Sequence, residues 1–199
     1  MIINKQIMVM VFITNAGPDR EAIARQIAAE RGAVVVPSYD HDFIIAGQGT
    51  VGLEITEQCA ELGVEPDHVL VCCGGGGLIA GSATALKARW PDIAVHTVEP
   101  EGFDDTARSL LSGQRECIDD EARSICDALQ AHAPGELTFA INRRLLDVGL
   151  VVSDEEVREA IRFAFQNLKL VAEPGGAVAL ALVVAGTFAV LVCGSARAQ

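Results

Sequence analysis

The sequence has 199 residues, half of them apolar, and its 27 acidic and 15 basic side chains give a formal net charge of −12. This length suits one sizeable domain or a domain with a fragment of another, and the apolar content supports a buried core rather than a disordered chain. The negative charge disfavours nucleic-acid binding, which needs clustered lysine and arginine side chains against the phosphates.

Short β-branched runs alternate with longer helical stretches along the chain. The runs predict strands at Ile7–Ile13, Ala33–Pro37, His68–Cys73, Ala94–Val98 and Phe188–Cys193. The longer stretches predict helices at Asp19–Arg31, Thr50–Leu62, Leu78–Trp90, Asp104–Leu111, Leu137–Asp147, Asp154–Leu170 and Gly176–Ala185, and Ser153 with Glu156 forms a capping box before the sixth. Strands that are apolar on both faces and separated by helices indicate a three-layer α/β fold with a mainly parallel sheet.

Two apolar segments resemble export or membrane segments. Ile7–Ile13 follows one lysine, but no cleavage site follows it, and the six cysteines have neither disulfide-framework nor zinc-site spacing. The span from Pro174 to Ala196 carries no charge over 23 residues, which is long enough for a membrane helix. Its glycines favour a buried helix, a turn and a buried strand instead. We expect a cytoplasmic protein with reduced thiols that does not enter a membrane.

The strand predicted at His68–Cys73 runs into four consecutive glycines, Gly74, Gly75, Gly76 and Gly77, and then into a helix. Glycines let backbone N–H groups approach an anion, and a helix N-terminus favours negative charge. No Walker lysine follows, although Glu99, about 20 residues on, leaves a dinucleotide site open. The alternative is a tight turn without a ligand, but four glycines lose much conformational entropy on folding. The loop therefore predicts a phosphate cradle.

Five stretches occur in a characteristic order: Ala46-Gly-Gln-Gly-Thr50, the four glycines, Val98-Glu-Pro100, Pro134-Gly-Glu-Leu-Thr-Phe139, and Leu168 to Ala177 with its Glu-Pro-Gly-Gly. Together they resemble the threonine/serine dehydratase and serine racemase branch of the fold-type-II pyridoxal-phosphate enzymes. The resemblance implies a lyase that eliminates water from serine or threonine, or a racemase. It also implies that residues 1–32 are the last strand and helix of a smaller domain, and that 33–199 form an incomplete cofactor-binding large domain.

The resemblance assigns cofactor-binding roles to individual positions. The four glycines match the loop that holds the phosphate of pyridoxal 5′-phosphate. Ala128 falls where the family usually has a glycine beside the cofactor ring, and Glu173 matches a glutamate near that ring. Cys193 falls where the family has a serine that hydrogen-bonds the pyridine nitrogen, and a thiol is the weaker hydrogen-bonding group.

A second site resembles the divalent-cation site of the family. Its ligands are the carboxylates of Glu99 and Asp105 and the main-chain carbonyl of Phe103. Two carboxylates and a backbone oxygen suit Mg²⁺ or Ca²⁺. The alternative is that Asp104 and Asp105 are an ordinary acidic helix start without a metal.

The family also has a lysine that forms a Schiff base with the cofactor and serves as acid and base. It lies in a Ser-Phe-Lys-type segment, followed by an Asn-His-Ala-type loop for the substrate carboxylate, and neither motif occurs here. The three lysines, Lys5, Lys87 and Lys169, lack that context, and Lys87 lies about 15 Å along a helix from the glycines. We therefore assign no catalytic residue and expect the chain, which looks truncated at both ends, to be inactive alone.

Three functional hypotheses follow. The chain is a lyase domain that a complementing chain completes, a non-catalytic anion-binding module, or a pseudoenzyme fragment without a ligand of its own. The expected partners are the cofactor, an amino-acid substrate, and a second copy or complementing chain, because truncation exposes apolar surface. Among the scattered histidines only His41 is predicted to face the site, and a solvated loop histidine is the alternative there.

Overall fold

The computed structural model describes residues 20–119 and 121–186. The chain divides into two compact units, residues 1–36 and 37–199. The described part of the first unit is helix α1 (Arg20–Arg31) and a stretch without regular structure after it. The strand predicted at Ile7–Ile13 lies outside the described residues, and the assignment of residues 1–32 to a smaller domain stays a prediction.

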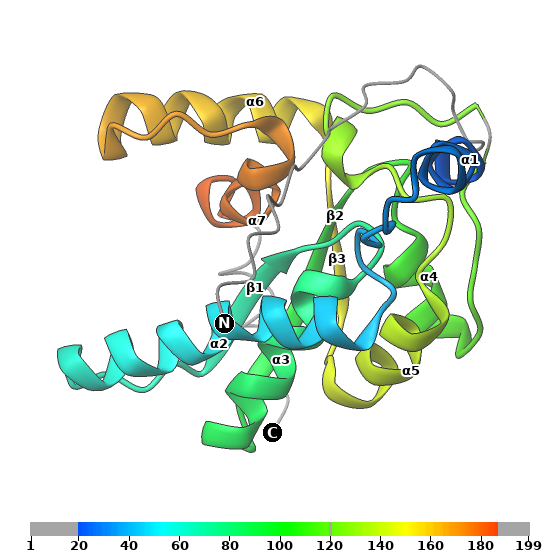
Figure 1. The fold of residues 1–199 in the computed structure, drawn as a ribbon. Coiled ribbons are helices and arrows are strands. Elements are labelled where there is room, and N and C mark those ends of the chain that lie inside the picture. Colours follow the sequence, from blue (N-terminus) through cyan, green and yellow to red (C-terminus); the bar gives the residue numbers. More distant parts are fainter. Residues whose placement is uncertain (1–19, 120, 187–199) are drawn as a thin grey trace. The chain divides into compact units, whose positions relative to one another are not determined.

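The second unit contains a parallel sheet whose strands are connected along the chain by helices (Figure 1). Its described elements are α2 (Asp42–Leu62), β1 (His68–Cys72), α3 (Gly77–Arg89), β2 (Ala94–Pro100), α4 (Asp105–Ser112), the 3₁₀ turn η2 (Asp127–Leu129), α5 (Glu136–Leu145), β3 (Gly149–Val152), α6 (Asp154–Phe163), the π-helical turn η3 (Ala164–Leu168) and α7 (Pro174–Val184). The described strands lie in the order β1-β2-β3, and both strand pairs are parallel. The predicted α/β fold with a parallel sheet is confirmed.

The strands bury side chains on both faces, which divides the core into two clusters. On one face Leu70 and Val98 join a cluster with side chains of α6 and α7, such as Val178. On the other face Val71 and Val95 pack with side chains of α3 and the residues beyond it. The sheet is therefore the middle of three layers, as the alternation of apolar strands and helices predicts.

Close packing of α2 on α3 explains why α2 begins at Asp42 rather than at the predicted Thr50. A Cβ atom on Gly52 would lie 2.6 Å from the Ser82 carbonyl oxygen, and one on Gly81 would lie 2.2 Å from that of Ile45. Gly49 and Gly52 thus let the two helix backbones approach, whereas glycine in a sequence usually indicates a turn.

The strand predicted at Ala33–Pro37 is wrong. These residues have no regular structure, and the side chains of Val34 and Val36 are 89% and 74% exposed. β-branched residues favour strands chiefly through packing against neighbouring strands, and no described strand pairs with this run. Conversely, β3 was not predicted; it has only four residues, and its Gly149 lies so close to α4 that a Cβ there would be 2.4 Å from the Ala107 Cα.

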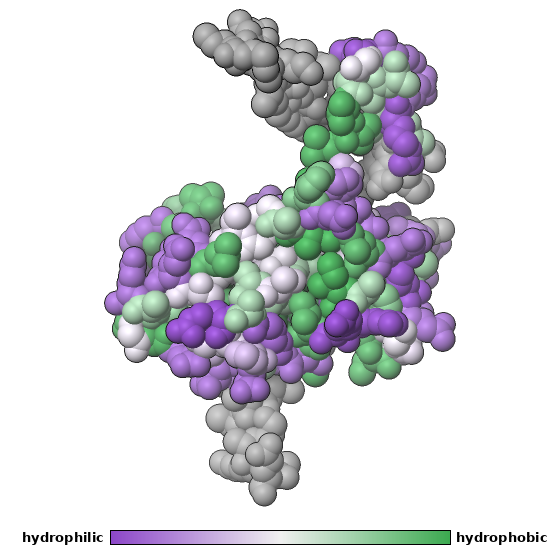
Figure 2. Space-filling view, turned by 60° about the horizontal axis from the view of Figure 1, so that its bottom comes forward, coloured by the Kyte–Doolittle hydropathy of each residue, from purple (hydrophilic) through white to green (hydrophobic). Residues whose placement is uncertain are grey.

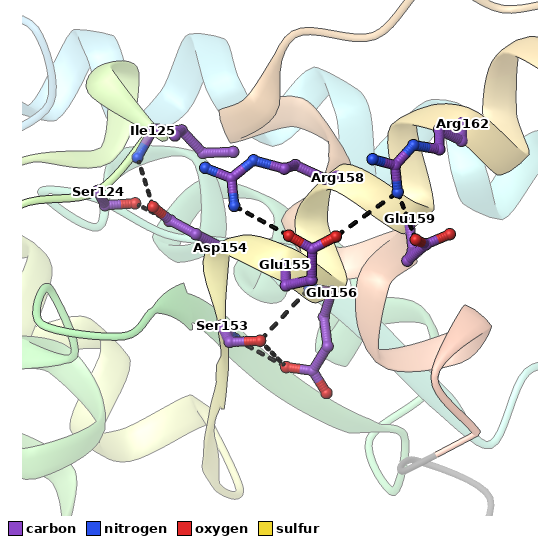
Figure 3. Close-up of polar contacts among 9 residues, drawn as sticks. All are labelled: Ser124, Ile125, Ser153, Asp154, Glu155, Glu156, Arg158, Glu159 and Arg162. Carbon is purple, nitrogen blue, oxygen red and sulfur yellow. Dashed lines mark hydrogen bonds and ion pairs between the residues drawn. The ribbon is translucent and has the colours of Figure 1, made fainter.

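The capping box at the start of α6 is confirmed, and its contacts are drawn in Figure 3. The Ser153 N–H donates to Glu156 Oε2 at 2.7 Å, and the Glu156 N–H donates to Ser153 Oγ at 3.3 Å. Next to the box, Asp154 accepts from Ser124 Oγ at 2.6 Å and from the Ile125 N–H at 3.1 Å. The start of α6 therefore holds the segment that leads into η2.

The end of this helix differs from the prediction. Regular α-helix stops at Phe163, and η3 follows instead of a continuous helix to Leu170. Lys169 then adopts the left-handed conformation, with φ 60°. The exposed ion pairs between arginine and glutamate on α6 contribute little to stability, because solvent screens them.

Apolar side chains remain on the surface of the second unit, where Figure 2 shows green areas among hydrophilic ones. Phe43 and Leu62 on α2 are 82% and 76% exposed, and Phe165 in η3 is 63% exposed. No described helix is both long and apolar enough to cross a bilayer. The described cysteines form no disulfide, and the strand predicted at Phe188–Cys193 lies outside the described residues.

The left-handed conformation of Lys169 makes a stability prediction. A residue with a Cβ loses about 1 kcal/mol there, and glycine does not. Replacing Lys169 by Gly should therefore give a protein about 1 kcal/mol more stable than the Lys169→Ala variant. Both variants lose the side chain, so their difference in urea unfolding isolates the backbone effect. Equal stability of the two would show that φ is not left-handed in solution.

Candidate functional site

The four-glycine loop lies between the end of β1 and the start of α3. Gly76 is the N-cap of α3, with φ 91°, a conformation that side chains disfavour. Among the described residues, no group accepts a hydrogen bond from the N–H groups of Gly74 to Leu78. The loop thus presents free backbone donors at the positive end of a helix, which is the arrangement that binds phosphate groups.

Close neighbours leave no room for side chains on the loop. A Cβ on Gly75 would lie 2.3 Å from the ring of Tyr39, and one on Gly77 would lie 2.9 Å from the Tyr39 Cα. A Cβ on Gly76 would lie 2.8 Å from Asn142 Nδ2. The backbone of the loop is therefore tightly enclosed, and the free N–H groups fit the phosphate of the cofactor that the sequence indicates.

Two further predicted cofactor residues lie beside this loop. A Cβ on Gly74 would lie 3.1 Å from the Cα of Leu129, which follows Ala128 in η2. A Cβ on Gly175 would lie 3.3 Å from the Cβ of Ala128 and 3.6 Å from Oε1 of Glu173, the N-cap of α7. The structure thus brings the glycine loop, Ala128 and Glu173 into one region, whereas Cys193 lies outside the described residues.

Two buried carboxyl groups occupy the predicted cation site. Glu99 on β2 accepts from the N–H groups of Thr106 and Ala107 at 3.0 and 2.7 Å, which caps the start of α4. Asp105 is fully buried, and neither of its carboxyl oxygens has a hydrogen-bond partner among the described residues. Phe103, which lies between these two residues in the sequence, has a buried side chain. The described residues contain no group of three or more histidine, cysteine, aspartate or glutamate side chains that could hold a metal ion.

Burial makes both carboxyl groups weak acids. Desolvation, reinforced by the charge of Asp105, raises the pKa of Glu99 to about 8, and desolvation raises the pKa of Asp105 to about 7. Such a pair binds protons near neutral pH or is suited to a bound cation. Because both oxygens of Glu99 accept from α4 inside the protein, the geometry disfavours a dinucleotide ribose there.

His41 and the two described lysines make contacts outside the glycine loop. His41 caps α2, with Nδ1 accepting from the Phe43 N–H at 3.2 Å, so the alternative of an exposed histidine is favoured. Lys87 lies at the other end of α3 from the loop, 3.5 Å from Asp147 Oδ2. Lys169 donates to the carbonyl three residues before it at 2.6 Å. Lys5 lies outside the described residues.

Sequence reasoning missed the residues that hold the loop from the side of α5. Asp40 accepts from the first N–H groups of α5, and Thr138 and Asn142 on α5 donate to loop carbonyls. Thr138 lies in Pro134–Phe139, one of the stretches that carry the family resemblance. Asp40, in contrast, is nearly 100 residues away from its partners in the sequence. The pattern of nearby residues therefore carried no indication of this contact.

Two of the histidines described as scattered meet on the sheet. His68 Nδ1 and His96 Nε2 are 3.0 Å apart, and their rings are stacked with centroids 5.3 Å apart. Burial lowers the pKa of His96. His68 begins β1 and the glycine loop follows its end, so the pair lies at the opposite end of the strand from the loop.

The raised pKa values predict a pH dependence of stability. An acid whose pKa is raised by folding contributes stability that is present below its ordinary pKa and lost as the pH rises through the folded value. For Glu99 the ordinary pKa is 4.5 and the folded pKa is about 8. For Asp105 the ordinary pKa is 3.8 and the folded pKa is about 7. In protein treated with a chelator, the free energy of unfolding should fall across this window by about 1.4 kcal/mol per pH unit for each carboxyl that stays protonated.

Replacing Asp105 by Asn should make that fall shallower between about pH 4 and pH 7, because one of the two groups no longer titrates. Urea unfolding at several pH values measures both slopes. An Asp105→Asn slope as steep as that of the unchanged protein would contradict the burial of this carboxyl in its uncharged form.

Comparison with known proteins gives a consistent set of relatives. The family profile described as pyridoxal-phosphate dependent enzyme matches residues 7–190. The chain is 40% identical over 172 residues to an L-threo-3-hydroxyaspartate ammonia-lyase from Pseudomonas sp, covering 86% of this chain and 52% of that protein. It is 38% identical over 163 residues to a serine racemase from Schizosaccharomyces pombe, covering 82% of this chain and 49% of the relative.

A solved structure, that of a threonine deaminase from T.th., matches with a TM-score of 0.79 and 43% identity, covering 82% of this chain and 55% of the other. The chain thus spans about half the length of the proteins that it matches.

Proposed function

The chain belongs to the pyridoxal-phosphate-dependent enzyme family, and we propose that it forms the cofactor-phosphate site of an ammonia-lyase for serine, threonine or a related hydroxy amino acid. The observation that carries this proposal is the glycine loop, whose N–H groups from Gly74 to Leu78 have no acceptor among the described residues. The similarity to an ammonia-lyase, a serine racemase and a threonine deaminase supports the substrate class.

In this proposal the main chain does most of the binding. The N–H groups of the loop and the N-terminus of α3 hold the phosphate without a lysine or arginine. Ala128 and Glu173 border the place of the cofactor ring, and Cys193 is proposed to meet the pyridine nitrogen. When bound, the cofactor supplies an electron sink for the amino acid's α-carbon. The protein's contribution is to position that ring and exclude water around it.

A glycine-to-alanine pair tests the phosphate site. The Gly75→Ala methyl would fall on the Tyr39 ring, whereas a methyl at Gly47 meets no atom within 4 Å. We expect pyridoxal 5′-phosphate to raise the melting temperature of the unchanged protein and of Gly47→Ala, and to do so much less for Gly75→Ala. Pyridoxal without the phosphate should stabilise none of them. Equal stabilisation of both variants by the phosphate ester would place its binding site elsewhere.

We further propose that the chain alone does not turn over its amino acid. Lys87 lies at the other end of α3 from the loop, and Lys169 donates to a carbonyl of its own turn. A positioned general base alone contributes about 10²–10⁴-fold to a rate. A complementing chain or a longer protein would then supply the lysine. The second candidate function, a non-catalytic anion-binding module, rests on the same loop and differs in requiring no such lysine.

Threonine turnover tests this proposal. Ammonia and 2-oxobutanoate formation with saturating cofactor should not exceed the rate of free cofactor in buffer. Turnover above that rate, abolished by replacing Lys5, Lys87 or Lys169 with Ala, would show that the chain carries its own catalytic lysine. If adding a homologous segment that contains the lysine produces turnover, the lyase is favoured over the anion-binding module.

For the buried carboxyl pair we propose Mg²⁺ or Ca²⁺, held by Glu99, Asp105 and the carbonyl of Phe103. The support is that both oxygens of Asp105 are buried without a partner among the described residues. A bound cation would favour the charged carboxylates and so offset their desolvation.

Titration of either cation at pH 8 should therefore raise the melting temperature, and the Asp105→Asn variant should lose the effect. The Asp104→Asn variant, which changes the neighbouring aspartate paired with Arg108, should keep it. Stabilisation that survives in Asp105→Asn would mean that the cation binds elsewhere.

A further inference from the structure

The carbonyl groups of the glycine loop are held by α5. The Gly75 carbonyl accepts from Thr138 Oγ1 at 2.7 Å and from the Gly135 N–H at 3.3 Å. The Gly76 carbonyl accepts from Asn142 Nδ2 at 3.3 Å and also from the Ala80 N–H of α3 at 3.0 Å. Thr138 and Asn142 lie one helical turn apart on α5, and both are fully buried.

Pinning a carbonyl also orients the N–H of the same peptide unit. The C=O of one residue and the N–H of the next lie in one plane and point in opposite directions. Bonds from α5 to the Gly75 and Gly76 carbonyls therefore turn the N–H groups of Gly76 and Gly77 away from α5. Those are two of the N–H groups without an acceptor in the described chain.

The burial of Asn142 supports a function for these bonds beyond stability. Its Oδ1 is buried with no partner among the described residues, which is unfavourable for a polar atom. An apolar residue at this position would avoid that penalty, but it would not donate to Gly76. Asn142 therefore combines a buried acceptor without a partner in the described chain with a donor to the loop.

Asp40 fixes the part of α5 from which these bonds come. Its Oδ2 accepts from the Glu136 N–H at 3.0 Å, and its Oδ1 accepts from the N–H groups of Leu137 and Thr138 at 2.9 and 3.0 Å. The N-cap residue, Gly135, has no side chain to do this, and a Cβ there would lie 2.3 Å from Asp40 Oδ1. One carboxylate from before α2 therefore satisfies the first donors of α5.

We propose that Asp40, Thr138 and Asn142 are positioning residues for the cofactor phosphate. They do not touch the anion; they set the direction of the Gly76 and Gly77 N–H groups that bind it. The proposal rests on the proposed function of the loop as a phosphate site. Preorganised donors bind an anion more tightly because the loop need not be ordered at the moment of binding.

The hydroxyl of Thr138 allows a matched test. Thr138→Val keeps the shape but removes the donor, and Thr138→Ser keeps the donor. Removing one hydrogen bond should weaken the binding of pyridoxal 5′-phosphate and of inorganic phosphate about tenfold in Thr138→Val, while Thr138→Ser stays within about twofold of the unchanged protein. Calorimetric titration well below the melting temperature of each variant measures these affinities.

Two aspartates near the start of α2 provide a second test. Asp40→Ala should weaken phosphate binding severalfold, because the start of α5 loses the acceptor for three N–H groups. Asp42→Asn removes an equal charge two residues later, from a side chain without a hydrogen bond or ion pair in the described chain, and should leave the affinity unchanged. This comparison separates positioning from a general effect of negative charge.

Amide spectra distinguish positioning from a merely structural role. In Thr138→Val and Asp40→Ala without a ligand, the Gly76 and Gly77 amide resonances should move, and Thr138→Ser should restore them. Unchanged phosphate affinity in folded Thr138→Val and Asp40→Ala would overturn the inference alone. If the unchanged protein binds neither phosphate nor the cofactor, the proposed function fails and the inference fails with it.

Discussion

The orientation of two peptide groups in the glycine loop is the constraint on which the site depends. A phosphate cradle without lysine or arginine works only if several backbone N–H groups face the same side. Backbone N–H and C=O groups form strong hydrogen bonds, so the opposite sides of these peptides need partners too. α5 and its N-cap provide them through Thr138, Asn142 and Gly135, and the Ala80 N–H of α3 adds a second bond to the Gly76 carbonyl. The proposed anion site therefore depends on the helix packed behind the loop as well as on the loop itself.

The same requirement explains the glycines around the loop. Gly75 and Gly77 face Tyr39, Gly76 faces α5, and Gly135 faces Asp40, so in each case a Cβ atom would overlap a neighbour. Only Gly76 among these needs glycine for its φ as well. Most of these glycines thus serve close packing of the main chain rather than flexibility. A loop enclosed in this way keeps its donors in place before the anion arrives, which lowers the entropy lost on binding.

The sequence predicted the parts of this site that depend on neighbouring residues. A buried strand followed by glycines and a helix is a local pattern, and the structure has β1, the loop and α3 in that order. The capping box of α6 is equally local. The link from Asp40 to α5 joins residues nearly 100 positions apart, so no periodicity or spacing indicates it. The helix predicted at Thr50–Leu62 begins eight residues earlier, because the close contact of its glycines with α3 is a tertiary effect. The strand predicted at Ala33–Pro37 rested on β-branched residues alone.

Amide chemical shifts are the most direct test of the proposal that the glycine-loop N–H groups, which have no acceptor in the described chain, bind the cofactor phosphate. A titration of glycine-labelled protein with pyridoxal 5′-phosphate, and a parallel one with pyridoxal, would report on each loop residue. We expect the resonances of Gly75, Gly76 and Gly77 to shift with the phosphate ester and not with pyridoxal, while those of Gly63 and Gly113, at helix ends with open space around them, stay unchanged. Loop resonances that do not respond to the phosphate ester, in a protein that binds it, would show that the phosphate binds elsewhere than at the loop.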